Sequence, residues 1–205
     1  MKKLTTWLLC LSFGAALVGC NAVSDETFTK KLTGTFSLID RHINLEIALE
    51  VGVELMLEEY LEVEEISTDI FLEYTDYYLA DNTLMTMGYI TMSFLEKEDS
   101  FVDEAFDMNY QYGISGTWSV ENGKIVYAYN FNKLHVQYVD NDATTMIGEL
   151  LAMFHEEIAE SLFTGFQEYY LGLESDSPKI LRINDKELAL MIGEERVEFK
   201  KSGTN

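Results

Sequence analysis

The chain has 205 residues, of which 47% are hydrophobic, enough for one domain with a substantial core. Acidic residues outnumber basic ones by 36 to 14, and the net charge of −22 excludes nucleic acid as a partner, because binding to phosphates needs clusters of Lys and Arg. Both cysteines, Cys10 and Cys20, lie in the first 20 residues, so we expect no structural disulfide in the folded domain.

The chain opens with a segment typical of an export signal. Lys2 and Lys3 form a short basic head, and residues 4–17 form an apolar run that is too short to span a bilayer stably. Small residues then lead to Cys20. On composition alone, the segment fits a secretory signal cut near Ala16, with Cys20 as a free thiol, or an uncleaved membrane anchor.

The end of this segment, Leu17-Val18-Gly19-Cys20, resembles the lipobox of bacterial lipoproteins. The resemblance implies that the Cys20 thiol is acylated, that residues 1–19 are removed, and that the new amino terminus is acylated as well. The membrane is then a partner through this lipid anchor. Asn21 is not the aspartate that holds lipoproteins in the inner membrane, so the resemblance implies the bacterial cell envelope, with the outer membrane as default and either face open.

The next residues contain no hydrophobic periodicity, and we predict a flexible tether over residues 20–31. Residues 32–38 alternate apolar and polar side chains and predict a first strand, with Leu32, Phe36 and Leu38 on one face. The predicted organisation is a signal peptide at 1–19, a lipidated cysteine with its tether at 20–31, and one domain at 32–202.

Residues 44–65 carry two competing periodicities. Aliphatic residues alternate with others as in a strand, whereas glutamates recur at every fourth position, as on one side of a helix. We favour a helix, because so long a strand would be unusual and Glu, Leu, Met and Ala are good helix formers. We interpret the glutamate stripe as a solvated face rather than a metal site, since the segment contains no histidine. Its members are Glu46, Glu50, Glu54, Glu58 and Glu62.

A hairpin and an acidic stretch follow. Residues 70–79 and 84–94 predict two strands, and Asp81 and Asn82 between them suit a left-handed turn. Residues 96–107 are rich in carboxylates, and we interpret them as a solvated loop. The alternative is a calcium site, but the stretch lacks the D-x-D-x-D-G spacing that places oxygen ligands around one ion.

The centre of the chain predicts an antiparallel meander. Residues 108–120 place mostly large apolar side chains on one face and polar ones on the other, with one glycine on each face, as in a strand with one buried face. Asn122-Gly123 is the strongest short hairpin signal, and it leads into predicted strands at 125–131 and 134–138.

The last third begins with a helical period over residues 142–170, with Asn141 or Asp142 as the cap and Gly172 as the stop. Short predicted strands at 180–183, 188–192 and 197–199 close the domain.

Three short motifs in this order resemble the lipocalin-like, or calycin-type, lipoproteins of bacterial envelopes. They are Gly34-Thr35-Phe36, the run from Gly116-Thr117-Trp118 to Asn122-Gly123-Lys124, and Leu188-Ala189-Leu190. The resemblance covers residues 32 to about 201. It implies a mainly β domain with two helices: an up-and-down antiparallel barrel with a helical insertion after the first strand and a second helix before the last strands.

Catalytic motifs are weak, and we predict no enzyme, no cofactor and no metal. His155-Glu156 begins like the zinc protease signature H-E-x-x-H, but Ala159 stands at the second histidine position. His42 and His135 are isolated in the sequence. The chain has no G-x-S-x-G elbow and no phosphate-binding glycine loop.

Two hypotheses for function remain. In the first hypothesis, a small hydrophobic ligand binds inside the barrel against an aromatic wall. The same aromatic side chains could instead fill the core and leave no cavity, and we favour this interpretation of them. The alternative hypothesis is an acidic protein-interaction module, such as an envelope assembly factor or an inhibitor of a basic enzyme, whose encounters are steered by charge. The candidate ligand-binding residues are Tyr110, Tyr112, Trp118, Tyr127 and Tyr129.

Overall fold

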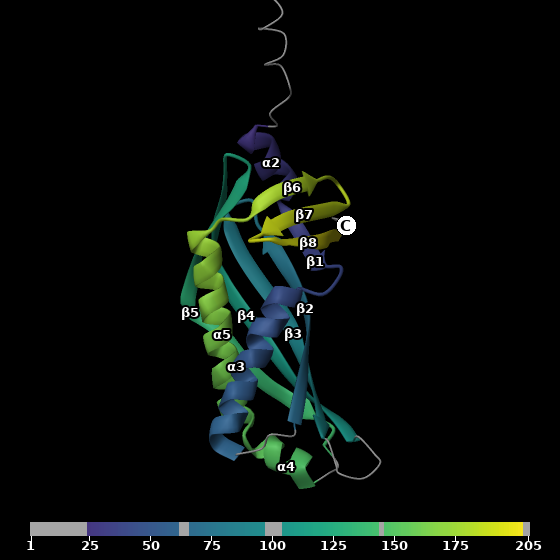
Figure 1. Cartoon of the computed structure of the whole chain (residues 1–205). Helices are drawn as coiled ribbons and strands as arrows, with labels where there is room; N and C mark the ends of the chain where they lie inside the picture. Colours follow the sequence, from purple (N-terminus) through teal and green to yellow (C-terminus); the bar gives the residue numbers. More distant parts are fainter. Residues whose placement is uncertain (1–23, 62–65, 97–103, 144–145, 203–205) are drawn as a thin grey trace, which may run out of the picture.

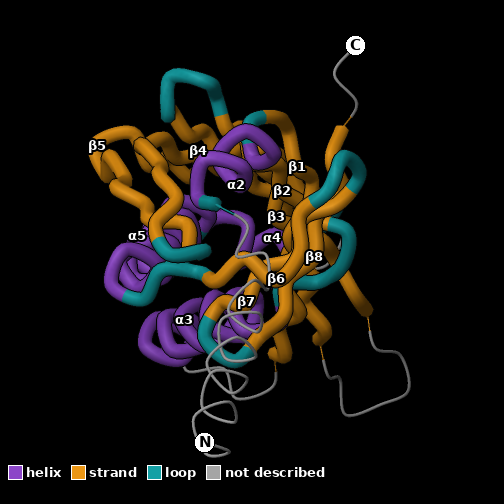
Figure 2. The backbone as a smooth tube through the Cα atoms, turned by 90° about the horizontal axis from the view of Figure 1, so that it is seen from above, coloured by secondary structure: helices purple, strands orange, loops and turns teal. Residues whose placement is uncertain are grey.

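The computed structural model describes residues 24–61, 66–96, 104–143 and 146–202, and in this part of the chain eight antiparallel strands form a closed barrel (Figures 1 and 2). The strands are β1 (Gly34–Leu38), β2 (Ile66–Tyr78), β3 (Thr83–Glu96), β4 (Glu104–Glu121), β5 (Lys124–Asn141), β6 (Lys179–Ile183), β7 (Glu187–Ile192) and β8 (Glu195–Ser202). The helices are α2 (Asp25–Leu32), α3 (Ile43–Leu61), α4 (Met146–Met153) and α5 (His155–Ser175). The predicted mainly β, up-and-down antiparallel barrel is confirmed, but the described residues hold four helices where two were predicted.

The strands differ greatly in length, and this sets the shape of the molecule. β2 to β5 have 13 to 18 residues, whereas β1 and β6 to β8 have 5 to 8. The ring is therefore complete only at one end, which we call the closed end. Beyond it the long strands continue as a curved sheet, and α3 and α5 lie on the concave side of that sheet (Figure 1).

The alternation of side chains along the long strands places the core. Along β2 and β3 every second residue is buried, including Leu72, Tyr78, Ile90 and Phe94. Helix α5 contributes a matching apolar stripe to the same core. Because the apolar period is 2 in the strands and helical in α5, both elements bury one side against each other.

Both predicted hairpin turns are confirmed. β2 pairs with β3 and β4 pairs with β5, and Asn82 and Asn122 have φ values of 65° and 54°. Asn and Gly are the residues that best tolerate this left-handed conformation. β4 and β5 run on past the predicted ends, and the strands predicted at 125–131 and 134–138 form one strand, β5. Its residues 131–134 bulge opposite Ile114.

The helical regions also differ in detail from prediction. The segment 44–65 does form a helix, α3, up to Leu61, while 62–65 lie outside the described residues. The region 142–170 contains two helices, α4 and α5, which meet at Phe154. In the acidic stretch, β3 runs to Glu96 and β4 begins at Glu104, and 97–103 lie outside the described residues.

The prediction of a flexible tether is wrong for residues 25–31, which form most of α2. Ser24 caps the helix by accepting the N–H of Thr27. The Asp25 carboxylate accepts the N–H groups of Asn122 (2.9 Å) and Gly123 (3.0 Å) in the β4–β5 turn. Leu32 is fully buried. The partners of these charge-assisted hydrogen bonds and of this apolar contact are distant in the sequence. A segment without its own hydrophobic periodicity therefore still folds onto the closed end.

Candidate functional site

The first two glutamates of the α3 stripe, Glu46 and Glu50, face the edge of β2. Glu46 is 1% exposed, and its carboxylate accepts the N–H of Leu72 (3.2 Å), while Glu50 accepts the N–H of Ile70 (2.9 Å). β1 pairs with β2 only over residues 75–78, so these two N–H groups face no strand. Carboxylates from α3 therefore satisfy the edge where β1 has ended. Our interpretation of the stripe as a solvated face is wrong for Glu46 and Glu50.

Arg41 also contacts the edge of β2 and Glu46 of α3. Its Nε donates to Glu46 (2.6 Å), and its Nη2 donates to Asp69 (3.0 Å) and to the carbonyl of Ile70 (2.9 Å). The guanidinium thus forms ion pairs with two carboxylates and donates to one strand carbonyl. Because the glutamates turn inward, the residues on another face of α3 become exposed. Ile43, Ile47, Val51 and Leu55 are 48–61% exposed.

The five aromatic residues that we predicted as a ligand wall all lie inside the fold. Tyr110, Tyr112, Trp118 and Tyr127 are buried and Tyr129 is half-buried. They pack against each other and against α5: the rings of Tyr112 and Phe166 stack at 4.2 Å, and those of Tyr129 and Tyr170 lie 4.6 Å apart. The cavity that Tyr127 and Tyr129 help to line has a volume of about 20 Å³. That is room for one water molecule, so these side chains fill the core.

A buried carboxylate, Asp76, lies among the tyrosines. It is 8% exposed and accepts a hydrogen bond from the hydroxyl of Thr86 (2.6 Å). Burial raises the pKa of Asp76 to about 7, with the Thr86 hydroxyl acting in the opposite direction. Burial also raises the pKa of the neighbouring Tyr112 and Tyr170 hydroxyls. The interior is thus a place where a carboxyl group holds its proton near neutral pH.

The three histidines have different surroundings in the structure. His42 is buried, with Nδ1 3.1 Å from the Tyr74 hydroxyl and Nε2 3.4 Å from Glu195, and burial lowers its pKa to about 4. Since it is neutral above that pH, its contact with Glu195 is not an ion pair at neutral pH. His155 packs against the Tyr138 ring, and His135 lies over Gly113. In the described ranges, no group of three or more His, Cys, Asp or Glu side chains is arranged to hold a metal ion.

The sequence did not suggest the feature that we consider the candidate binding surface, on the outer face of β2 and β3. Register places the exposed residues in rows: Glu73 beside Tyr89, Thr75 beside Met87, and Tyr77 beside Met85. We define the outer-sheet surface as Phe71, Tyr77, Met85, Met87 and Tyr89. Four of them, all but Tyr77, are 40–58% exposed.

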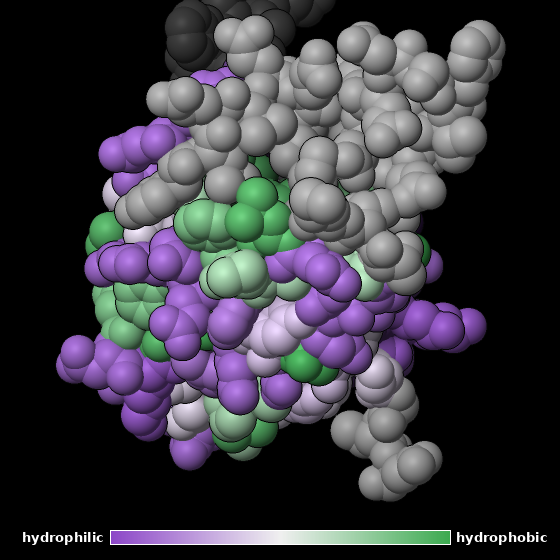
Figure 3. All heavy atoms as spheres, turned by 90° about the horizontal axis from the view of Figure 1, so that it is seen from below, coloured by the Kyte–Doolittle hydropathy of each residue, from purple (hydrophilic) through white to green (hydrophobic). Residues whose placement is uncertain are grey.

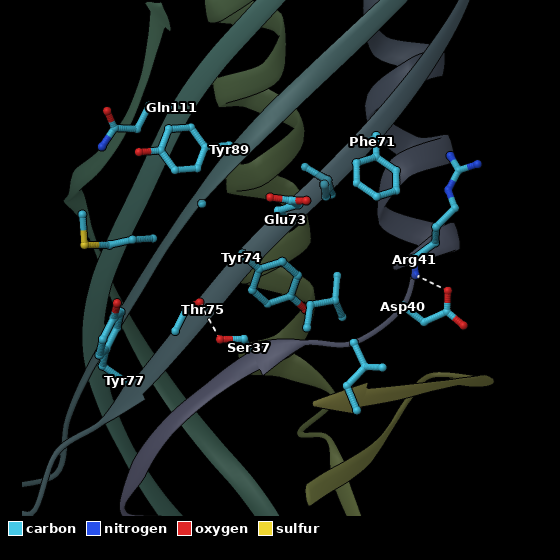
Figure 4. Close-up of a pocket in the computed structure, with 15 residues that line it drawn as sticks. Ser37, Asp40, Arg41, Phe71, Glu73, Tyr74, Thr75, Tyr77, Tyr89 and Gln111 are labelled. Atoms are coloured by element: carbon cyan, nitrogen blue, oxygen red, sulfur yellow. Dashed lines mark hydrogen bonds between the residues drawn. The ribbon is translucent and has the colours of Figure 1, made fainter. Parts of the chain in front are cut away.

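This surface borders two hollows. A groove of about 550 Å³ lies where β1 leaves β2 and the chain turns towards α3, and Figure 4 shows Glu73 between the rings of Phe71 and Tyr89 in its wall. A second hollow of about 350 Å³ lies beside the β5 bulge. Met87 lines both of them.

The β3 and β4 side of this outer face is uncharged over a long distance, and Glu73 of β2 is the acidic side chain that lies between Phe71 and Tyr89. The outward positions of β3 between Thr83 and Ser93 carry no charged side chain, and neither do those of β4 between Asn109 and Ser119. In a chain with 36 acidic residues, such a stretch of Tyr, Phe, Met, Thr and Ser is a distinct environment. The strand alternation predicts that these residues face outward, but only the observed register shows that they form one surface.

Comparisons with known proteins add little to this description. No protein-family model matches the chain, and no curated protein sequence matches it significantly. One solved structure, of a lipopolysaccharide binding protein, aligns with 84% of this chain at 11% identity and a TM-score of 0.22. The alignment spans half the length of that protein. Among the described residues, no helix is both long enough and apolar enough to cross a membrane.

Proposed function

We propose that this chain is a lipid-anchored lipoprotein of the bacterial envelope whose domain binds a basic protein on the outer-sheet surface. The lipobox-like Leu17-Val18-Gly19-Cys20 supports the anchor and, by default, the outer membrane. The motif Gly34-Thr35-Phe36 in β1 and the closed antiparallel ring support a lipocalin-like domain. The observation that carries the binding role is the exposed aromatic and methionine-rich surface, bordered on the β3 and β4 side by uncharged residues, on a strongly acidic chain.

The outside of the barrel supports binding better than the inside. Ligand pockets in proteins usually have a volume of about 300–1,000 Å³, and the two outer hollows fall in this range. The interior cavity has a volume of about 20 Å³. A small hydrophobic ligand would have to displace packed core rings such as Tyr112 and Phe166. We therefore prefer the protein-interaction hypothesis to the ligand hypothesis.

Composition and charge suggest the kind of partner. Centres of protein interfaces are depleted of charged residues and enriched in aromatic residues, Met and Arg, as in the outer-sheet surface with Arg41 at its border. Asp40 and Glu73 also line the groove. Because the chain as a whole is acidic, a basic protein would be attracted over long distances, while acidic partners would be repelled.

Site-specific photo-crosslinking in the native host tests this proposal. A benzophenone amino acid replaces Met87 in the full-length protein, and the matched control carries it at Leu171 on α5, which is similarly exposed at 47% compared with 41%. We expect a crosslinked basic protein from position 87 but not from 171. The adduct should disappear with Tyr89→Asp, and also when membranes are irradiated in 1 M salt, where the screening length is about 3 Å. Equal adducts from both positions, or an adduct that resists both changes, would overturn the proposal.

A further inference from the structure

We infer that the closed end of the barrel faces the lipid bilayer and that the long axis of the domain points away from it. This inference rests on the proposed acylation of Cys20. It concerns a surface formed by α2, the β4–β5 turn and strands β6 to β8, which lies at the end of the molecule where the chain enters the domain (Figure 1).

Helix α2 is attached firmly to this end. Besides the two hydrogen bonds of Asp25 to the β4–β5 turn, the ammonium group of Lys201 in β8 donates to the carbonyl of Lys31 (2.7 Å). Leu32 is buried in the core. The helix is thus tied to opposite sides of the closed end, so that its first residue has a defined position on the domain.

Very little chain separates this fixed point from the acylated residue. Ser24, the cap of α2, follows Cys20 by four residues, which span at most about 14 Å even when fully extended. The acyl chains must enter the bilayer, so the closed end is held within roughly that distance of the lipid surface. A tether reaching to residue 31 would have left the domain free to tumble.

The distribution of charge favours the same orientation. Nine basic and ten acidic residues lie on the closed end, counted over 24–33, 79–82, 121–124 and 176–202, so it is nearly neutral. The rest of the mature chain holds 26 acidic and only three basic residues. Exposed lysines at the closed end, including Lys31 and Lys186, suit an anionic lipid surface, whereas the acidic remainder is repelled by it.

The length of the sheet places the acidic part of the domain far from the closed end. The 14 residues of β3 rise about 46 Å from the turn at the closed end to Glu96, which is more than five screening lengths at physiological salt. Seen from the opposite end, the described residues present hydrophilic side chains interspersed with hydrophobic ones (Figure 3). An upright domain therefore keeps most of its acidic residues out of the field of the headgroups and leaves the outer-sheet surface free at its side.

Energy transfer in vesicles tests the orientation. The lipidated full-length protein is purified from its host and reconstituted in phosphatidylcholine vesicles containing 30% phosphatidylglycerol and an acceptor on the lipid headgroups. A donor is attached through Lys186→Cys at the closed end or, as the matched exposed position, through Glu149→Cys on α4. Because the long strands separate these positions by tens of ångströms, we expect roughly threefold or more transfer from position 186 than from 149. Equal or reversed transfer would overturn the inference.

Two controls separate the causes. Asp25→Ala removes the hydrogen bonds that dock α2 and should reduce the difference between positions 186 and 149, whereas Glu26→Ala alters only an exposed ion pair with Lys30 and should leave the difference unchanged. Flotation with the vesicles is measured in every sample. If the wild-type protein fails to float, the proposed lipid anchor is wrong; if it floats but position 149 is as close to the headgroups as position 186, the orientation alone is wrong.

Discussion

Replacing Glu46 with alanine should destabilise the domain, although the residue belongs to a stripe that has the pattern of a solvated helix face. The Glu46 carboxylate accepts hydrogen bonds from Arg41 and from the backbone of Leu72. A buried N–H left unsatisfied costs about 1–3 kcal/mol. The contribution of Arg41 is smaller, because its side chain is 41% exposed and water can replace the lost partner. We expect the free energy of unfolding to fall by about 2–3 kcal/mol.

Urea unfolding followed by tryptophan fluorescence measures this change. Trp118 is 2% exposed and is the only tryptophan after residue 19, so its emission reports directly on the core. With a urea m-value of about 2 kcal/mol/M for a domain of this size, the midpoint should decrease by about 1–1.5 M at unchanged m.

Two further variants show whether the cause is the contact with the edge of β2. Glu46→Gln keeps an oxygen acceptor for the Leu72 N–H and should lose only about 1 kcal/mol. Glu58→Ala, in the exposed part of the same stripe, should change stability by no more than about 0.5 kcal/mol. If Glu46→Ala and Glu58→Ala have the same small effect, α3 does not satisfy the edge of β2 as described.

Three other outcomes are expected. Burial raises the pKa of Asp76 from 3.8 to about 7, so the native state binds the proton more tightly than the unfolded chain and loses stability as the pH rises from 4 to 7. Asp76→Asn should restore this lost stability, by as much as about 4 kcal/mol at pH 8. Equal pH profiles of the two proteins in urea titrations would contradict this. Gly88→Ala should lower the melting temperature, since its Cβ would lie 2.4 Å from the carbonyl oxygen of Glu73. Gly172→Ala, on the open face of α5, should stabilise the domain by about 0.5–1 kcal/mol. A higher melting temperature for Gly88→Ala than for Gly172→Ala in calorimetry would refute this packing. Labelled palmitate should be incorporated into the wild-type chain and not into Cys20→Ser, and labelling of both would exclude the proposed anchor.

The strands and turns of the sheet could be predicted because their signals are local. Residues 108–120 alternate between a mostly apolar face and a polar one, and Asn122-Gly123 has few conformations other than the turn that it adopts. The helical period of α5 is equally local, and so is the choice of helix for α3. In each case one short window of sequence contains the pattern that decides the structure.

The errors concern partners that are distant in the sequence. Glu46 and Glu58 have the same spacing in the stripe, and only the early end of β1 brings an unsatisfied strand edge to Glu46. Asp25 is an unremarkable acid until the β4–β5 turn, nearly one hundred residues later, offers it two N–H groups. The outer-sheet surface depends in the same way on the register of β2 and β3, which places Tyr77 beside Met85.

The pairing of the first strand with the last has a consequence for how the polypeptide acquires its structure. Thr35 in β1 lies opposite Ser202 in β8, so the ring cannot be completed before β8 has been synthesised. Joining segments so far apart costs on the order of 4–5 kcal/mol of loop entropy. The long β2–β5 meander has only neighbouring connections and can assemble first, while β1 waits with one unpaired edge. A polypeptide truncated before β8 would keep that edge open, along with the edge of β7, and would be prone to aggregate through them.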